Sequence, residues 1–251
     1  MSDIITETAG GVMRLRLNRP GKKNALTKAM YADLTAGLIA AGADETVSSV
    51  VISGEGADFC AGNDIFDFAQ EFPAMQASGA PLDELPVFRF LKALTFFEKP
   101  LIAAVHGQAV GVGVTLLLHC DLVVAADDVR LTLPFLKLGL VPEAGSTLLL
   151  PQRIGHARAF AWMALGEAVG AEQALALGLA NRVAPRGDID AVAGEMAAKI
   201  GRLSPGALRH TKALMRDPDA LWQVVRAEGD IFRRLLTSPE AMAAFAAFMN
   251  K

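Results

Sequence analysis

Two glycine-containing segments each follow a short apolar run with the pattern of a buried strand. The first spans residues 54–65 and the second spans residues 105–113. Glycine permits the sharp turn that each segment needs, and free N–H groups at the start of the following helix can point at an anion. Taken alone, each segment is a strand-to-helix turn. Taken together, the two turns could donate two backbone N–H groups to one oxygen atom, as an oxyanion hole does.

One carboxylate is placed to act as an acid or base. Glu143 follows Pro142 and precedes a helical run. A carboxylate in an apolar pocket has a raised pKa, which brings it toward the working range of a general base, and Phe135, Leu136 and Leu140 could supply the pocket wall. The alternative is structural, because an acidic residue in the first turn of a helix interacts favourably with the helix dipole.

Other reactive residue types do not form a recognisable site. The four histidines lack metal-ligand spacing, and Cys60 and Cys120 cannot form a zinc site without them. Gly111 and Gly113 lack the third glycine of a dinucleotide fingerprint, and no phosphate-loop lysine follows them. We therefore expect no metal and no bound nucleotide cofactor. Cys60 and His106 are expected to be packed residues beside the two turns.

The elements that must position these residues change along the chain. Period-two or apolar runs predict strands, and a four-residue apolar spacing predicts a helix from Leu26 to Leu38. The strands are expected at residues 12–17, 50–52, 101–105 and 122–124. The helix expected next to the second turn covers 113–119, and residues 71–87 are expected to form a loop or a broken helical excursion. Beyond residue 155 strand signals nearly vanish and helical runs follow, with Asp188, Ser204 and Ser238 as N-caps.

Composition excludes several classes of protein. The 251 residues are 52% hydrophobic and 20% charged, with a net charge of −3, so the chain can bury a core and has no basic stripe for nucleic acid. The most apolar stretch, residues 110–126, is short for a bilayer span and is interrupted by His119 and Asp121. We expect a cytoplasmic protein with no membrane or nucleic-acid partner.

Four motifs in order resemble the crotonase superfamily of enoyl-CoA hydratases and isomerases. They are Asn18-Arg19-Pro20 followed by Asn24-Ala25-Leu26, then residues 59–65, then residues 99–113, and finally Cys120-Asp121. The resemblance extends from the N-terminal strand to the C-terminal helices. It implies an α/β fold, a crotonase-like spiral of ββα units in residues 1–190, and a C-terminal helical trimerisation region in residues 191–251.

The resemblance also implies a ligand and a site. The ligand would be an acyl-CoA thioester, with coenzyme A as part of the substrate and no further cofactor. The thioester oxygen would be held by the backbone N–H groups of Asn63 and Val112. Residues along the CoA and acyl moieties would be Lys22, Ala25, Ala61, Gly62, Asp64, Ile65, Gly111 and Phe135. Lys22 is equally well explained as an exposed loop lysine, whereas Asp64 is better explained as a cap of the following helix. The assembly would be a homotrimer or homohexamer.

Two departures from the superfamily pattern narrow the chemistry. Hydratases use two glutamates to activate water, and this chain has Thr115 and Phe135 at the corresponding positions. Neither side chain can act as a carboxylate base. The stretch from Pro134 to Glu143 instead resembles the Pro-Phe-x-x-Leu-Gly-x-x-x-Glu pattern of peroxisomal-type Δ3,Δ2-enoyl-CoA isomerases, in which this glutamate is the single acid and base.

The function expected from the resemblance is therefore isomerisation. Glu143 would take a proton from C2 of a 3-enoyl thioester and return it at C4, which would feed unsaturated fatty acids into β-oxidation. The alternatives are hydration, or another crotonase chemistry with the same carboxylate, such as ring isomerisation or dehalogenation. A non-catalytic acyl-CoA-binding module is a further alternative, against which Glu143 and both glycine turns argue.

Overall fold

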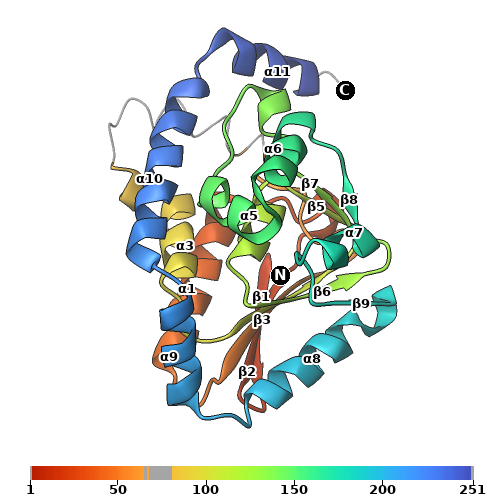
Figure 1. Ribbon diagram of the computed structural model, residues 1–251, viewed down its shortest axis with the longest axis vertical. Helices are drawn as coiled ribbons and strands as arrows, with labels where there is room; N and C mark the ends of the chain where they lie inside the picture. The colour runs from red at the N-terminus through yellow and green to blue at the C-terminus, as the bar shows by residue number, and fades with distance from the viewer. Residues whose placement is uncertain (1, 65–66, 68–80, 250–251) are drawn as a thin grey trace.

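The computed structural model describes residues 2–64, 67 and 81–249, and these residues form two sheets surrounded by helices (Figure 1). The larger sheet has the strand order β1-β2-β3-β4-β6-β9 and the smaller has the order β5-β7-β8. The larger sheet consists of β1 (Ile4–Ala9), β2 (Val12–Leu17), β3 (Ser49–Gly54), β4 (Leu101–Val105), β6 (Leu122–Ala126) and β9 (Arg182–Ala184). The smaller consists of β5 (Gln108–Val110), β7 (Arg130–Thr132) and β8 (Val169–Gly170).

The helices lie between and after these strands. Before residue 140 the chain contains η1 (Pro20–Lys22), α1 (Lys28–Ala43), η2 (Leu82–Glu84), α3 (Pro86–Thr95), α4 (Val112–Thr115), η3 (Leu116–Leu118) and η4 (Leu136–Leu138). Beyond residue 140 it contains α5 (Ser146–Ile154), α6 (His156–Leu165), α7 (Ala171–Ala176), η5 (Arg186–Asp188), α8 (Ile189–Ile200), α9 (Pro205–Met215), α10 (Pro218–Leu235) and α11 (Pro239–Met249).

The chain builds both sheets by repeating one path. It passes through β4 in the larger sheet, enters the smaller sheet as β5 and then forms α4; β6 and β7 repeat this path. β3, β4 and β6 are parallel neighbours, and so are β5 and β7. A parallel bridge between Cys60 and Ala109 joins the segment after β3 to β5. This segment lies beside β5 in the same way that β5 lies beside β7. The result is a spiral of ββα units.

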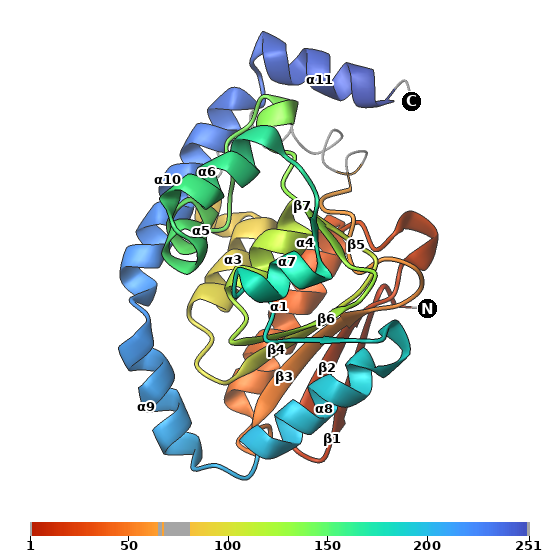
Figure 2. The ribbon, with the colours of Figure 1, turned by 45° about the vertical axis from the view of Figure 1, so that its right-hand side comes forward.

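Helices cover both faces of the larger sheet, as Figure 2 shows. On one face α1 and α3 contribute Leu34 and Leu94 to a core that also contains Leu15 of β2. On the other face α8 packs Ala193 against Ile102 and neighbouring strand residues. The strands β3 and β4 are therefore apolar on both faces, as expected for parallel strands between two helical layers. This rigid support carries the loops that leave the strands.

The last helices form a long arm along one side of the molecule, drawn in blue in Figures 1 and 2. Within this chain α10 packs against α3 and α5, and α11 packs against η4. The expected caps Ser204 and Ser238 are confirmed, because their side chains accept hydrogen bonds from the N–H groups of Ala207 and Ala241. Asp188 precedes α8, but its side chain makes no capping bond.

Most expected elements are present, and three expectations need correction. The helix expected at 113–119 is only one turn of α-helix followed by η3, because residues 116–118 tighten to 3-10 geometry. Strands do not end before residue 155, since β8 and β9 add short edge pairings. The expected loop 71–87 lies outside the described residues up to residue 80, and its last part contains η2 and the start of α3.

In the part of the chain that the structure describes, we find no helix with the length and apolar character needed to cross a membrane. α10 has 18 residues, but it carries charged side chains along its length.

Candidate active site

The two glycine turns lie side by side. Cys60 and Ala109 form a parallel bridge, with hydrogen bonds from Cys60 N to Gln108 O (3.1 Å) and from Val110 N to Cys60 O (2.9 Å). Asn63 follows Cys60 by three residues, and Val112 follows Ala109 by three residues. Each predicted oxyanion donor therefore comes three residues after the bridge that joins the two segments.

Glycine is required where both segments turn. Gly62 has φ +93° and Gly111 has φ +55°, in the region that L-residues rarely adopt. A Cβ at Gly62 would lie 3.0 Å from Val110 O, and a Cβ at Gly113 would lie 2.7 Å from Cys60 O. These glycines let the two segments approach closely, which side chains at these positions would prevent.

The turns leave the predicted donors available. Within the described chain, neither the N–H of Asn63 nor that of Val112 has a hydrogen-bond partner. Val112 is the first residue of α4, so its N–H has no partner within the helix. The side chain of Asn63 is fixed separately, because the buried hydroxyl of Tyr31 donates a short hydrogen bond to its Oδ1. Both backbone groups are thus free to bind an oxygen atom of a ligand.

Glu143 is joined to the second turn through Thr115. The Thr115 hydroxyl donates a 2.6 Å hydrogen bond to Glu143 Oε1, and Thr115 N is bonded to Gly111 O. Burial of the carboxyl raises the pKa of Glu143 from its ordinary value to about 7; the Thr115 bond opposes this rise and the charge of Glu228 adds to it. A carboxylate with this pKa can both take and return a proton near neutral pH.

The helix-capping alternative for Glu143 is not what the structure shows. α5 begins at Ser146, and the Glu143 side chain accepts a hydrogen bond from Thr115 instead of from the first N–H groups of that helix. Its backbone oxygen accepts from Ser146 N at 3.1 Å. The side chain is therefore directed to the glycine turn.

Phe135 contributes an apolar wall. It is 6% exposed, and its ring atom Cζ lies 3.8 Å from the place a Cβ would take on Gly111. The Tyr31 phenol lies beside this region, since it is bonded to Asn63 Oδ1. Burial, and to a smaller extent the charge of Glu143, raise the pKa of Tyr31 well above its usual value. The site thus combines one carboxylate, two free N–H groups and an apolar wall.

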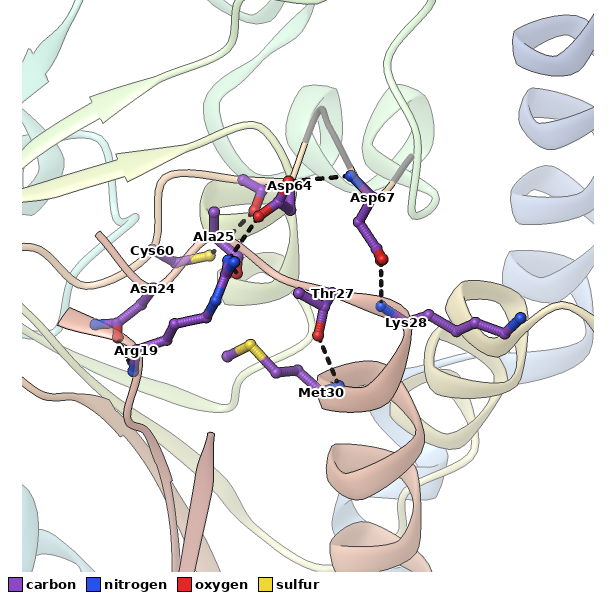
Figure 3. A network of polar contacts seen from close by, with 10 residues as sticks. Arg19, Asn24, Ala25, Thr27, Lys28, Met30, Cys60, Asp64 and Asp67 are labelled. Carbon is purple, nitrogen blue, oxygen red and sulfur yellow. Dashed lines mark hydrogen bonds and ion pairs between the residues drawn. The ribbon is translucent and has the colours of Figure 1, made fainter. Parts of the chain in front are cut away.

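A polar network holds the end of the first turn next to the start of α1, as Figure 3 shows. Arg19 forms an ion pair with Asp64 at 2.6 Å and also donates to Ala25 O at 3.1 Å. Asp64 Oδ1 accepts from Asp67 N at 3.1 Å, which is the bond expected of a helix cap, although the rest of the following segment lies outside the described residues. The Asp67 carboxylate in turn accepts from Lys28 N at the start of α1.

The other residues expected along the ligand lie around this network. Ala61 is bonded through its N–H to Lys23 O, and Gly62 O accepts from Leu26 N. Lys22 is exposed at the surface. Ile65 lies outside the described residues.

Two other candidates from the sequence have structural roles. Cys60 is fully buried and burial raises its pKa to about 12, so its thiol is not a nucleophile. His106 makes a hydrogen bond between Nε2 and Gly56 O. Among the described residues, no group of three or more His, Cys, Asp and Glu side chains is arranged to hold a metal ion.

Sequence patterns did not point to Tyr31, His119 or Glu228, which the structure brings to the site. Tyr31 lies on the apolar face of α1 and is the only tyrosine in the sequence, which could have been a signal. Glu228 contacts residues more than 80 positions earlier. The spacing of residues along the sequence cannot predict a contact between residues this far apart.

Comparisons with known proteins agree on one family. Residues 7–251 match the sequence model of the enoyl-CoA hydratase/isomerase family. The chain is 35% identical to 2,3-dehydroadipyl-CoA hydratase of Escherichia coli (strain K12), covering 100% of this chain and 97% of that protein. It is 32% identical to enoyl-CoA delta isomerase 2 of Rattus norvegicus, covering 99% of this chain and 63% of that protein. The solved structure of Pseudomonas aeruginosa OdaA matches with a TM-score of 0.93 at 44% identity, covering 100% of both chains.

Proposed function

Because the chain belongs to the enoyl-CoA hydratase/isomerase family, we propose that it moves the double bond of a 3-enoyl-CoA thioester to the 2-position, with Glu143 as the single acid and base. The observation that carries this proposal is the Glu143 carboxylate itself. It is bonded to Thr115 at the end of α4, and the first residue of α4 offers a free N–H group.

The reaction requires one proton to leave and one to arrive. The Glu143 carboxylate removes a proton from C2, and the electrons of that C–H bond form an enolate that is conjugated with the C3–C4 double bond. The N–H groups of Asn63 and Val112 would bind the enolate oxygen, which lowers the energy of this intermediate. Protonated Glu143 then gives the proton to C4, and the double bond is left between C2 and C3.

The pKa of Glu143 suits both half-reactions. A carboxylate with an ordinary pKa is a weak base, whereas one with a pKa of about 7 is a stronger base and still an acid at neutral pH. Burial supplies this change, and Phe135 contributes to the apolar surroundings.

Isomerisation is favoured over hydration by the residues that replace the hydratase glutamates. Thr115 donates to Glu143, and the Phe135 ring lies over Gly111, so neither position carries a group that activates water. Hydration is nevertheless the second candidate, because 2,3-dehydroadipyl-CoA hydratase is a relative over almost its whole length. Ring isomerisation and dehalogenation would use the same carboxylate on another acyl group.

The remaining expectations are part of the same proposal. The CoA moiety would follow Lys22, Ala25, Ala61, Gly62 and Asp64, and no further cofactor would be needed. Large apolar side chains are exposed on α9, where Leu214 is 89% and Met215 79% accessible. Such side chains favour an assembly in which neighbouring copies cover them, and the resemblance suggests a homotrimer or homohexamer.

The test uses 3-hexenoyl-CoA and 2-hexenoyl-CoA and follows the ultraviolet band of the conjugated enoyl thioester. With wild-type protein and the 3-enoyl substrate, we expect the band to appear. Glu143→Gln should lower kcat about 100- to 10,000-fold, since the amide cannot accept the C2 proton. Glu195→Gln is the matched control, because Glu195 is exposed on α8.

The two substrates separate the candidate functions. If the band of 2-hexenoyl-CoA disappears and 3-hexenoyl-CoA is unchanged, the protein is a hydratase and the proposal is wrong. If neither substrate reacts, isomerisation of simple enoyl thioesters is excluded. A Glu143→Gln variant with full isomerase activity would exclude Glu143 as the base.

A further inference from the structure

α10 carries a buried carboxylate at a distance in sequence from the proposed base. Glu228 is 5% exposed, although α10 is otherwise rich in exposed charged residues. Its two carboxylate oxygens accept three hydrogen bonds, from Gly145 N (2.6 Å), Thr147 N (2.9 Å) and Thr147 Oγ1 (2.5 Å). All three donors belong to the segment that follows Glu143 directly.

That segment is a tight turn with unfavourable backbone angles. Ser146 N is bonded to Glu143 O, and the two central residues, Ala144 and Gly145, have φ +62° and +72°. Positive φ at both central positions is the pattern of a type I′ turn. For alanine this conformation costs about 1–3 kcal/mol and persists only where surrounding contacts enforce it.

Three buried side chains hold this turn. His119 Nε2 donates to Ala144 O at 2.7 Å, and Thr115 donates to the Glu143 carboxylate. Glu228 accepts from Gly145 N within the turn and from Thr147 N just after it. His119 and Thr115 belong to the α4–η3 segment that follows the second glycine turn. Glu228 approaches from α10, so it ties the turn to the C-terminal helices.

We propose that Glu228 is a positioning residue, which fixes the turn carrying Glu143 and thereby aims the Glu143 carboxylate at the substrate. The inference rests on the proposed role of Glu143 as the base. Glu228 itself is bonded to backbone and threonine donors, so it acts through the turn and not on the substrate.

Glu228 has a second effect through its charge. The titratable groups around Glu143 in the described chain are Tyr31 on α1, His119 at the end of η3 and Glu228 on α10. Burial keeps Tyr31 protonated and lowers the pKa of His119 to about 4, so both are neutral at pH 7. The negative charge of Glu228 therefore raises the pKa of Glu143, and its removal should lower that pKa.

The test compares Glu228→Gln with the control Asp230→Asn, an exposed residue on the same helix that pairs with Arg233. Glutamine cannot accept a hydrogen bond through its NH₂ group, so at least one of the three bonds is lost. At pH 8.5, where Glu143 is ionised in every variant, we expect kcat on 3-hexenoyl-CoA to fall about 10- to 100-fold with KM changed less than twofold. The acid limb of the pH profile should move to lower pH.

Amide hydrogen exchange provides a readout that does not depend on turnover. In Glu228→Gln, peptides covering residues 143–149 should exchange faster than in wild type, and those in Asp230→Asn should not. If the wild-type protein is inactive, the proposed function is wrong. The hydrogen-exchange result is independent of activity, so faster exchange in Glu228→Gln would still show that Glu228 fixes the turn.

A milder variant keeps the proposal testable if Glu228→Gln does not fold. Thr147→Val removes only the hydroxyl donor from an exposed residue, and we expect a smaller loss of kcat with unchanged KM. The proposal is overturned if folded Glu228→Gln keeps wild-type kcat and exchange. If that variant is unfolded, wild-type kcat and exchange in Thr147→Val overturn it.

Discussion

Thr115 is the residue that the resemblance to hydratases places at a glutamate position, and its hydroxyl donates to Glu143 Oε1 at 2.6 Å. A hydrogen bond to the ionised carboxylate stabilises that form and so lowers the pKa of Glu143, against the larger effect of burial. The balance of these two effects places the pKa at about 7. If Glu143 is the base, as proposed, Thr115 adjusts the strength of that base and does not react itself.

Replacing Thr115 by valine should weaken the base at neutral pH. Without the hydroxyl the pKa of Glu143 rises, so a smaller fraction of the carboxylate is ionised at pH 7. We expect about a tenfold loss of kcat/KM at pH 7, which becomes smaller as the pH is raised, and an acid limb displaced upward from about pH 7. The measurement is the pH profile of kcat/KM for the wild type, Thr115→Val and the control Thr115→Ser. A Thr115→Val profile that overlays the wild type would show that the hydroxyl does not control the base.

At the scale of the elements, the site depends on two short turns that cross closely. Gly62 has φ +93°, and a Cβ there would lie 3.0 Å from Val110 O in the second turn. The direction of the Asn63 N–H follows from this backbone conformation. A side chain at Gly62 would change the turn and the predicted oxyanion hole together.

Gly62→Ala should therefore cost both stability and activity. We expect a loss of unfolding free energy of roughly 1–3 kcal/mol from the left-handed backbone and the close contact. The loss of kcat should be greater than stability alone explains, since the folded fraction remains near one. Urea unfolding and steady-state kinetics measure the two effects. Gly206→Ala on α9 is the control, because no atom lies within 4 Å of its Cβ position and its φ is ordinary. Unchanged kinetics in folded Gly62→Ala would contradict an oxyanion role for this turn.

Local patterns in the sequence predicted the elements with long or apolar signatures. The strands at 101–105 and 122–126 and the helices α8 to α11 lie close to where the periodicity and caps placed them. β8 and β9 have only two and three residues, which is too short for a period to be visible. Their pairing is decided by neighbours in the sheets and not by their own residues.

The candidate site was predictable in part for the same reason. The two glycine turns and Glu143 are visible as local motifs. The bonds from Tyr31 to Asn63 and from Gly145 to Glu228 join residues 32 and 83 positions apart. Such contacts form only when the helices pack against each other, so no local pattern in the sequence predicts them.

At the scale of the whole molecule, the residues of the candidate site destabilise the folded state, and the rest of the fold offsets this loss of folding free energy. The Glu143 carboxyl is desolvated, Ala144 has a left-handed backbone, and Glu228 is a second buried acid with a raised pKa. The two-faced core around β3 and β4 and the packing of α10 on α3 and α5 supply the compensating stability. Replacing the buried Glu143 carboxyl by a neutral group should therefore stabilise the protein and abolish the proposed chemistry.

The pH dependence of the stability of Glu143→Gln tests whether the buried carboxyl destabilises the fold. The pKa of Glu143 is about 7 in the folded state and near 4.5 when unfolded, so the folded state binds its proton more tightly. Below about pH 4.5 both states are protonated and the wild type has no penalty from this group. As the pH rises through 7 the wild type loses up to about 3 kcal/mol, which the neutral glutamine does not lose. The amide oxygen of that glutamine can still accept the Thr115 hydrogen bond.

We therefore expect the stability advantage of Glu143→Gln over the wild type to be several times larger at pH 8 than at pH 5. Urea unfolding at both pH values measures the difference, and Glu195→Gln corrects for the loss of one surface charge. The charge of Glu228 contributes to the raised pKa of Glu143, so its repulsion of the ionised Glu143 is part of the expected difference. A difference that is the same at pH 5 and pH 8 would mean that the folded protein does not hold the Glu143 proton, and the base would then have to act with an ordinary carboxylate pKa.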